Sequence, residues 1–183
     1  TWSMGKTVVS TDDVLIQKRT ISSKKYLIAV GASPVVPDNL ARAALEAEVP
    51  YLTYRMLLRP NSNTTLLSET YNNIVIIGGG ATACELGQSL SKLRRDNMNI
   101  SIVAPTLLPT EDAPLQNSVI NILSNDGCNL ILETRAVDVK RYGADEGARI
   151  ILSNEESIPV DCIIFCTGRS PNSSLQSLQM DKA

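Results

Sequence analysis

The segment from Ile74 to Ala83 reads Ile-Val-Ile-Ile-Gly-Gly-Gly-Ala-Thr-Ala, and it constrains the fold of this chain more than any other. Apolar strand formers are followed by three glycines and then by residues that suit a helix. This order predicts a buried strand, a tight loop and the start of a helix. A helix N-terminus offers free backbone N–H groups and a favourable dipole to phosphate groups. The segment therefore predicts a site for the pyrophosphate of a dinucleotide cofactor.

Individual residues of this loop have distinct predicted roles. Gly78 allows the tight turn out of the strand, Gly80 lets the backbone approach the phosphates, and Ala83 keeps the helix close to the strand. The alternative is a glycine turn that binds nothing. A strand before the loop and a βαβ unit around it favour the cofactor site, whose predicted loop residues also include Gly79, Ala81 and Thr82.

The pattern after the glycine loop predicts an α/β fold with a parallel sheet. Strand and helix signals alternate, and two late strands joined through Gly143 and Gly147 form a hairpin-like excursion. The predicted strands span 74–77, 100–103, 129–133, 136–141, 149–153 and 161–166, and the predicted helices span about 81–95 and 112–125. We expect Leu115, Val119, Ile122 and Leu123 on the apolar face of the second helix, which Asp126 and Gly127 close.

The chain before the glycine loop divides into a β-rich part and a connection. Strand signals occur at 7–10, 14–16 and 26–30, and Pro34 and Pro37 predict that the last strand stops at Gly31. From 38 to 70 a short helical stretch, two further prolines and a polar run predict a connection between domains.

Composition and charge exclude several functional classes. The formal net charge is −2, with 17 basic and 19 acidic residues and no basic face, so we expect no nucleic-acid partner. No apolar run approaches the roughly 20 residues that span a bilayer, and the start lacks the apolar core of a signal peptide. We expect no membrane partner and an intracellular protein. A first residue of Thr and an end without a stop signal suggest a piece of a longer chain.

The four cysteines are predicted to be buried core residues. Cys162 and Cys166 lie on one strand, where four residues separate the Cα atoms by about 13 Å, whereas a disulfide needs less than about 7 Å. No metal site is expected, and the absence of histidine means that an imidazole base would have to come from elsewhere.

The residue after the second strand of the unit bears on the choice of nucleotide. An acid there would bind the ribose hydroxyls of NAD, and a nearby arginine would suit the 2′-phosphate of NADP. Ala104 stands at this point, followed by Pro105 and Thr106, so both the acid and the arginine are missing. The sequence leaves NAD and NADP open.

Three segments of the chain, residues 26–34, 78–88 and 163–172, have sequences and an order that resemble the FAD-dependent pyridine nucleotide-disulfide oxidoreductases, which include dihydrolipoamide dehydrogenase, glutathione reductase and mercuric reductase. Residues 26–34 resemble a strand beside the flavin nucleotide that ends in Thr-Gly-Ala/Ser-x-Pro, although Val30 replaces the Thr. Residues 78–88 resemble the NAD(P) fingerprint. Residues 163–172 resemble the return from the NAD(P) domain to the FAD domain. Residues 84–88 and 52–55 look most like the mercuric reductase and lipoamide dehydrogenase branch.

The resemblance implies a Rossmann-like three-layer NAD(P)-binding domain with a parallel sheet and a β-meander, and part of a β-rich FAD domain. Its implied boundaries are 1–37 for the first FAD-domain segment, 38–70 for the connection, 71–166 for the NAD(P)-binding domain and 167–183 for the return toward the FAD domain. It implies NAD or NADP as cofactor, with FAD and a homodimer in the intact protein. The compartment would be cytoplasmic or organellar, in a mitochondrion or plastid.

The resemblance also implies roles for single residues. Glu85 would face the flavin and pair with a lysine of the FAD domain, and Gly31 and Ala32 would let the backbone approach FAD. Gly168 belongs to the return motif, and Arg169 either reaches the nicotinamide nucleotide or fixes the loop before Pro171. Each has a structural alternative: an ordinary helix glutamate for Glu85, and a strand-ending turn for Gly31 and Ala32.

Several family features are absent from the chain: the FAD glycine loop, the redox cysteine pair, the Gly-Asp flavin motif and the dimerisation domain that supplies a catalytic histidine. No catalytic residue is therefore assigned here. The implied function is the NAD(P)H-binding part of an oxidoreductase that passes hydride to FAD and on to a disulfide or metal ion. The alternatives are a non-catalytic nucleotide-binding module and an NADH oxidase or ferredoxin reductase type without the cysteine pair.

Overall fold

The computed structural model describes residues 2–5, 18–21, 27, 29–58, 71–94 and 96–172. The chain divides into two compact units, one formed by Thr1–Gly31 with Asn172–Ala183 and the other by Ala32–Pro171. In the smaller unit β1 (Trp2–Gly5) and β2 (Lys18–Ile21) pair antiparallel. The strands predicted at 7–10 and 14–16 lie outside the described residues.

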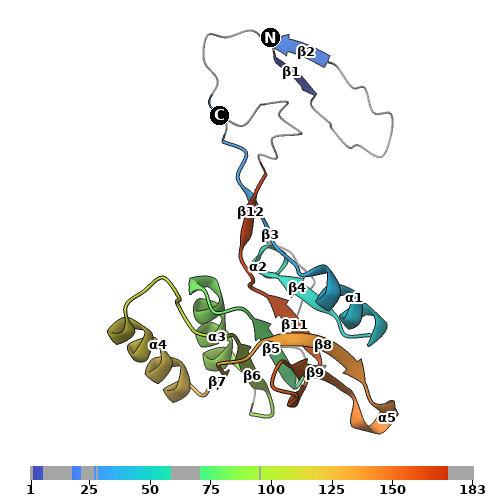
Figure 1. The fold of residues 1–183 in the computed structure, drawn as a ribbon, viewed down its shortest axis with the longest axis vertical. Helices are drawn as coiled ribbons and strands as arrows, with labels where there is room; N and C mark the ends of the chain where they lie inside the picture. The colour runs from blue at the N-terminus through green and yellow to red at the C-terminus, as the bar shows by residue number, and fades with distance from the viewer. Residues whose placement is uncertain are drawn as a thin grey trace. The chain divides into compact units, whose positions relative to one another are not determined.

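The larger unit is built on a five-stranded parallel sheet with the order β4-β11-β5-β6-β7 (Figure 1). Its strands are β4 (Tyr51–Thr53), β5 (Asn73–Ile77), β6 (Asn99–Val103), β7 (Asn129–Ile131) and β11 (Cys162–Phe165). The predicted parallel α/β sheet is confirmed. From β5 the chain extends the sheet through β6 to β7, and it later returns to the opposite side of β5 as β11.

The two faces of the sheet are covered by different elements, which makes three layers. On one face Ile74 and Ile76 pack with the apolar side chains of α3 (Ala81–Leu93) and with Leu123 of α4 (Ala113–Asn125). On the other face Val75 and Ile77 pack with α1 (Asp38–Glu46) and with a three-stranded meander. Burial on both faces explains why the central strands carry uninterrupted apolar runs, at 74–77 in β5 and over Cys162–Phe165 in β11.

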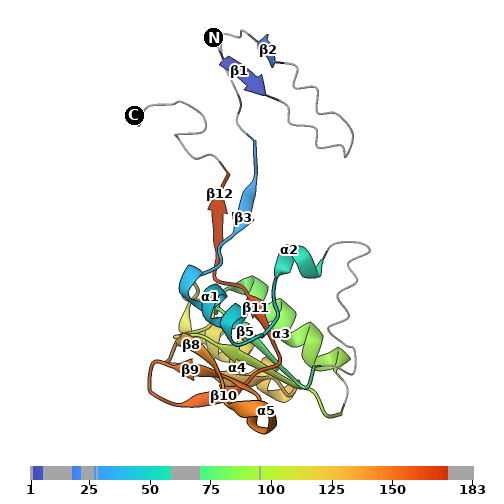
Figure 2. The same cartoon turned by 90° about the vertical axis from the view of Figure 1, so that its right-hand side faces the viewer.

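The meander consists of β8 (Ala136–Arg141), β9 (Ala148–Leu152) and β10 (Ser157–Pro159), all antiparallel (Figure 2). The predicted hairpin through Gly143 and Gly147 is confirmed, with a single turn of helix, α5 (Gly143–Glu146), inside the connection. Strand β10 was missed because its three residues are too short to show alternation.

The structure differs from the sequence prediction over residues 38–58, which were assigned to a connection between domains. Leu40, Ala43 and Ala44 of α1 are buried in the core beneath the meander, and β4 pairs with β11 as an edge strand of the parallel sheet. The short helix α2 (Tyr54–Leu57) follows β4, and the Thr53 hydroxyl accepts a hydrogen bond from the Met56 N–H. The prolines of this segment predict an irregular connection, so its tertiary packing could not be predicted from the sequence.

The strand predicted at 26–30 is also wrong, because the described residues 27, 29 and 30 have no strand conformation. A strand instead occurs where the prolines predicted its end: β3 (Ala32–Pro34) pairs antiparallel with β12 (Arg169–Pro171). A two-stranded ribbon has two edges, and proline is tolerated at an edge because its missing N–H need not pair. Pro34 and Pro171 stand at the C-terminal ends of these strands.

The helix predictions near the glycine loop are confirmed within two residues at each end. Asp112 caps α4 by accepting a hydrogen bond from the Leu115 N–H, and Gly127 follows its end with φ of +77°. The predicted apolar face of α4 is only partly correct, because Leu115 and Ile122 are 44% and 48% exposed and Leu123 is the one fully buried residue of the helix. In the described part of the chain, no helix has the length and apolar character to cross a membrane.

Candidate nucleotide-binding site

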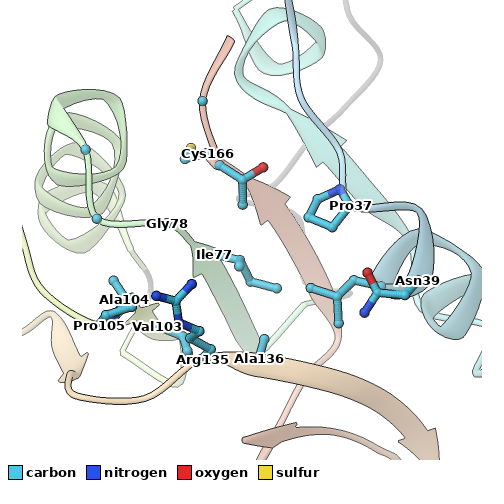
Figure 3. Close-up of a pocket in the computed structure, with 15 residues that line it drawn as sticks. Pro37, Asn39, Ile77, Gly78, Val103, Ala104, Pro105, Arg135, Ala136 and Cys166 are labelled. Carbon is cyan, nitrogen blue, oxygen red and sulfur yellow. The ribbon is translucent and has the colours of Figure 1, made fainter. Parts of the chain in front are cut away.

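A cavity of about 530 Å³ lies at the carboxyl ends of β5, β6 and β11, entirely within the larger unit (Figure 3). It spans the point where the strand order reverses between β5 and β11, which is where open α/β sheets bind their ligands. The glycine loop crosses its centre, and α1 and the start of β8 form its sides. Its lining residues are Pro37, Asn39, Leu40, Ile77, Gly78, Gly79, Gly80, Val103, Ala104, Pro105, Arg135, Ala136, Cys166, Thr167 and Gly168.

The first two glycines of the loop are required by contacts within the protein. Gly78 has φ of +128°, and a Cβ there would overlap the backbone carbonyl of Cys166. A Cβ on Gly79 would overlap the Thr106 carbonyl oxygen and lie 2.9 Å from the Ala104 Cβ. These glycines hold the loop against the ends of β11 and β6, because no other residue leaves room for that approach.

Gly80 differs, because nothing lies within 4 Å of the position its Cβ would occupy. Its φ of −78° and ψ of 176° are accessible to any residue, so neither backbone strain nor packing requires a glycine here. It stands at the N-cap of α3, where no side chain caps the helix. The open space beside an uncapped helix N-terminus suits a phosphate group that needs close backbone contact.

The helix residues after Gly80 divide into two groups. Ala81 and Thr82 form the first turn of α3 behind the glycine, and their N–H groups lie at its N-terminus. Ala83 is completely buried in the core between α3 and the sheet, in agreement with its predicted packing role. The predicted loop therefore contains two glycines with no room for a Cβ, Gly78 and Gly79, one glycine that faces open space, Gly80, and the start of a helix.

The structure adds a cation that the sequence prediction missed. Arg135 precedes β8 and lines the cavity together with Ala104 and Pro105, and in Figure 3 its side chain points toward the glycine loop. A signal was present, because Arg135 follows the strand β7, which pairs with β6, and the carboxyl ends of parallel strands meet at one edge of a sheet. The residues directly after β6, Ala104 to Thr106, include no cation.

Glu85 lies elsewhere, at a second cavity of about 260 Å³ between α3 and α4. This cavity is also lined by Ala81, Gln88, Leu108 and Val119 among others. Glu85 is exposed, and within the described residues no ion pair holds its carboxylate. The flavin-facing role that the resemblance implies for Glu85 stays a prediction.

The return segment after β11 connects the cavity to the β3–β12 ribbon. Thr167 and Gly168 line the cavity. Two hydrogen bonds join them to Val35: the Thr167 hydroxyl donates to the Val35 carbonyl oxygen at 2.6 Å, and the Val35 N–H donates to the Gly168 carbonyl oxygen at 3.0 Å. The Arg169 guanidinium lies over the Tyr54 ring, 5.1 Å from its centroid. This cation–π contact joins the return segment to α2, and both roles predicted for Arg169 stay predictions.

Gly31 and Ala32 fall on the boundary between the two units. Gly31 belongs to the smaller unit, has φ of +71°, and its carbonyl oxygen accepts a hydrogen bond from the Asn172 N–H at 2.9 Å. Ala32 begins β3, and its carbonyl oxygen accepts a hydrogen bond from Arg55 at 3.2 Å. Neither residue lines the cavity, which leaves their proposed contact with a second nucleotide as a prediction.

All four cysteines are buried and free, as predicted. Burial raises the pKa of Cys162 and of Cys166 to about 12, and it also raises the pKa of Cys84 and of Cys128. Because a thiol reacts as its thiolate, Cys166 at the cavity wall is a packing residue rather than a nucleophile. Among the described residues, no group of histidine, cysteine or acidic side chains could hold a metal ion.

The fold is an α/β fold with a candidate nucleotide site at the strand-order reversal, and comparison with known proteins places the chain in a family. The family model for pyridine nucleotide-disulphide oxidoreductases matches residues 2–183, and the chain belongs to this family of FAD- and NAD(P)-dependent oxidoreductases. The chain is 31% identical over 171 residues to a mercuric reductase of Staphylococcus aureus and 28% identical to one of Lysinibacillus sphaericus. These alignments cover 92% and 93% of this chain but 29% of each relative, so the chain spans less than a third of their length.

Solved structures share the fold. LpdA from Mycobacterium tuberculosis superposes with a TM-score of 0.66 at 23% identity, over 93% of this chain and 33% of that one. An engineered water-forming NADPH oxidase bound to NADPH also gives a TM-score of 0.66, at 20% identity, over 93% of this chain and 37% of that one. The Rossmann-like fold of the larger unit is thereby confirmed.

Proposed function

We propose that this chain is the NAD(P)H-binding part of a flavin-dependent oxidoreductase in which hydride passes from the nicotinamide to FAD and on to a disulfide or metal-ion acceptor. One observation carries the proposal: Gly80 opens onto empty space at an uncapped helix N-terminus, at the strand-order reversal of a parallel sheet. A structural glycine turn would not need that space, whereas a bound pyrophosphate would use it.

The sheet order supports an orientation for the cofactor. Strands β6 and β11 flank β5 on opposite sides, so Ala104 and Gly168 bound the cavity on either side of the glycine loop. We assign the pyrophosphate to the loop at residues 78–83, the adenosine half to the side of Ala104, and the nicotinamide half to the side of Gly168. In this role the chain binds and orients the dinucleotide, and the bound cofactor supplies the hydride.

The remaining parts of the proposal rest on the resemblance to the family. Gly31, Ala32 and Glu85 would contact FAD, and residues 1–37 and 167–183 would belong to the FAD domain. The grouping of 1–31 with 172–183 in a separate compact unit supports this division. The intact protein would be a homodimer, and the mercuric reductases among its relatives favour the metal ion of the two proposed acceptors.

Calorimetric titration of the folded chain with NADH and with NADPH tests the nucleotide site. We expect at least one of them to bind, and binding of neither would overturn the proposal. For the catalytic role, rapid mixing of NAD(P)H with the FAD-containing protein should bleach the flavin absorbance, and a disulfide or Hg²⁺ should restore it. Nucleotide binding without flavin reduction would instead identify a non-catalytic binding module. Reoxidation by oxygen alone would identify an oxidase.

A further inference from the structure

We propose that Arg135 binds the 2′-phosphate of NADPH and makes the site prefer NADPH over NADH, an inference that rests on the proposed nucleotide site. Two requirements for NADPH selection are a missing acid at the end of the second strand and a cation within reach of the ribose. Ala104 meets the first requirement. The sequence offered no cation next to Ala104, but the fold brings Arg135 to the same side of the cavity (Figure 3).

The backbone of Arg135 is held firmly. Its N–H donates to the Ser153 hydroxyl at 3.1 Å, and its carbonyl oxygen accepts a hydrogen bond from the Ser153 N–H at 2.8 Å. The same hydroxyl lies 2.9 Å from that of Thr134, whose side chain is buried. These contacts fix the start of β8 and therefore the direction in which the arginine leaves it.

The guanidinium of Arg135, in contrast, has no hydrogen bond or ion pair with any of the residues that the structure describes. Two other arginines of the larger unit have such partners: Arg149 donates to Ser157 at 2.8 Å, and Arg141 donates to the Ala47 carbonyl oxygen at 2.8 Å. A fixed backbone with an unpaired guanidinium at a cavity wall is suited to a ligand anion, since guanidinium binds phosphate in a bidentate manner.

Backbone hydrogen bonds connect the segment before Arg135 to the end of β6. The Ala104 N–H donates to the Ile131 carbonyl oxygen at 3.1 Å, and the Glu133 N–H donates to the Pro105 carbonyl oxygen at 3.1 Å. Because these bonds tie the segment leading to Arg135 to the end of β6, the cation lies beside the expected ribose position. The Ala104 side chain is buried and uncharged, so it offers no repulsion to a phosphate.

Titration calorimetry with four probes tests this assignment: NADPH, NADH, 2′,5′-ADP and 5′-AMP. We expect the chain to bind NADPH and 2′,5′-ADP about tenfold more tightly than NADH and 5′-AMP, since a charge-assisted pair contributes on that order. Arg135→Gln should remove this preference without changing the affinity for NADH, and Arg135→Lys should retain part of it. The matched control is Arg42→Gln, which removes an exposed arginine of α1 that does not line the cavity.

The outcomes separate the two proposals. If NADH and NADPH bind with equal affinity and Arg135→Gln changes neither, the role of Arg135 is refuted while the nucleotide site stands. An equal loss for 2′,5′-ADP and 5′-AMP in Arg135→Gln would also refute it, because the arginine would then contact the adenosine and not the 2′-phosphate. If neither dinucleotide binds to a chain with native circular dichroism, the nucleotide site and this inference both fail.

Discussion

Gly80→Val separates cofactor binding from folding. At Gly80 the backbone is extended, with φ of −78° and ψ of 176°, and no atom lies within 4 Å of the added Cβ. The Cβ of a valine therefore meets no protein atom, and we expect its side chain to project into the space that we assign to the pyrophosphate. The same change at Gly79 would force a Cβ into the Thr106 carbonyl oxygen.

The expected stability change for Gly80→Val is small because two effects oppose each other. Valine is a poorer N-cap than glycine, at a cost of up to about 1 kcal/mol, while reduced freedom of the unfolded chain returns about 0.4–1 kcal/mol. The net change should stay within about 1 kcal/mol, or about 4 °C in Tm. Each lost hydrogen bond to a charged phosphate costs about 1.5–3 kcal/mol, so losing two should weaken binding at least about a hundredfold.

Thermal unfolding followed by circular dichroism measures the first quantity, and titration with NADPH and NADH measures the second. Gly79→Ala is the matched control, and overpacking at this position should cost about 1–3 kcal/mol or more and lower Tm. Undiminished nucleotide affinity in Gly80→Val would refute the placement of the pyrophosphate. A large loss of stability in that variant would show that Gly80 is needed for folding.

Three further predictions concern stability and titration. Asp161→Ala should destabilise the larger unit by about 1–3 kcal/mol in denaturant unfolding. The Asp161 carboxylate accepts hydrogen bonds from the Asn72 and Asn73 N–H groups at 3.0 and 2.8 Å, and these bonds connect the start of β11 to β5. Asp161→Asn should retain much of the stability. The Asp126 carboxyl should titrate below its ordinary pKa of 3.8, because it accepts a hydrogen bond from Gln88 and pairs with Lys92. The contribution of Asp126 to stability is thus present above pH 3.8 and lost as the pH falls through its lower folded-state pKa. NMR titration of Gln88→Ala should show a higher pKa for Asp126. Iodoacetamide at pH 8 should modify none of the four cysteines in the folded chain and all of them in denaturant, because burial raises the pKa of each thiol. Rapid modification of the folded chain would contradict their burial.

Local patterns explain the parts of the fold that could be predicted. The strand, loop and helix from 73 to 93 each have a strong local signal, namely a run of apolar residues, three glycines and a helical stretch. The hairpin of β8 and β9 has glycines at its turn. In contrast, β4 and β10 are three residues long, and their strand conformation depends on pairing with β11 and β9. No window of the sequence contains that information.

The site divides in the same way. The sequence by itself determined the glycine loop, because the chemistry of close backbone approach requires particular residues at consecutive positions, and those residues are visible in the chain. Only the tertiary structure decided that Gly78 and Gly79 are held by Cys166 and Thr106 while Gly80 faces open space. It also brought Arg135, 31 positions after Ala104, to the same cavity wall. The physical reason is that a parallel sheet gathers the ends of its strands at one edge, whatever their separation along the chain.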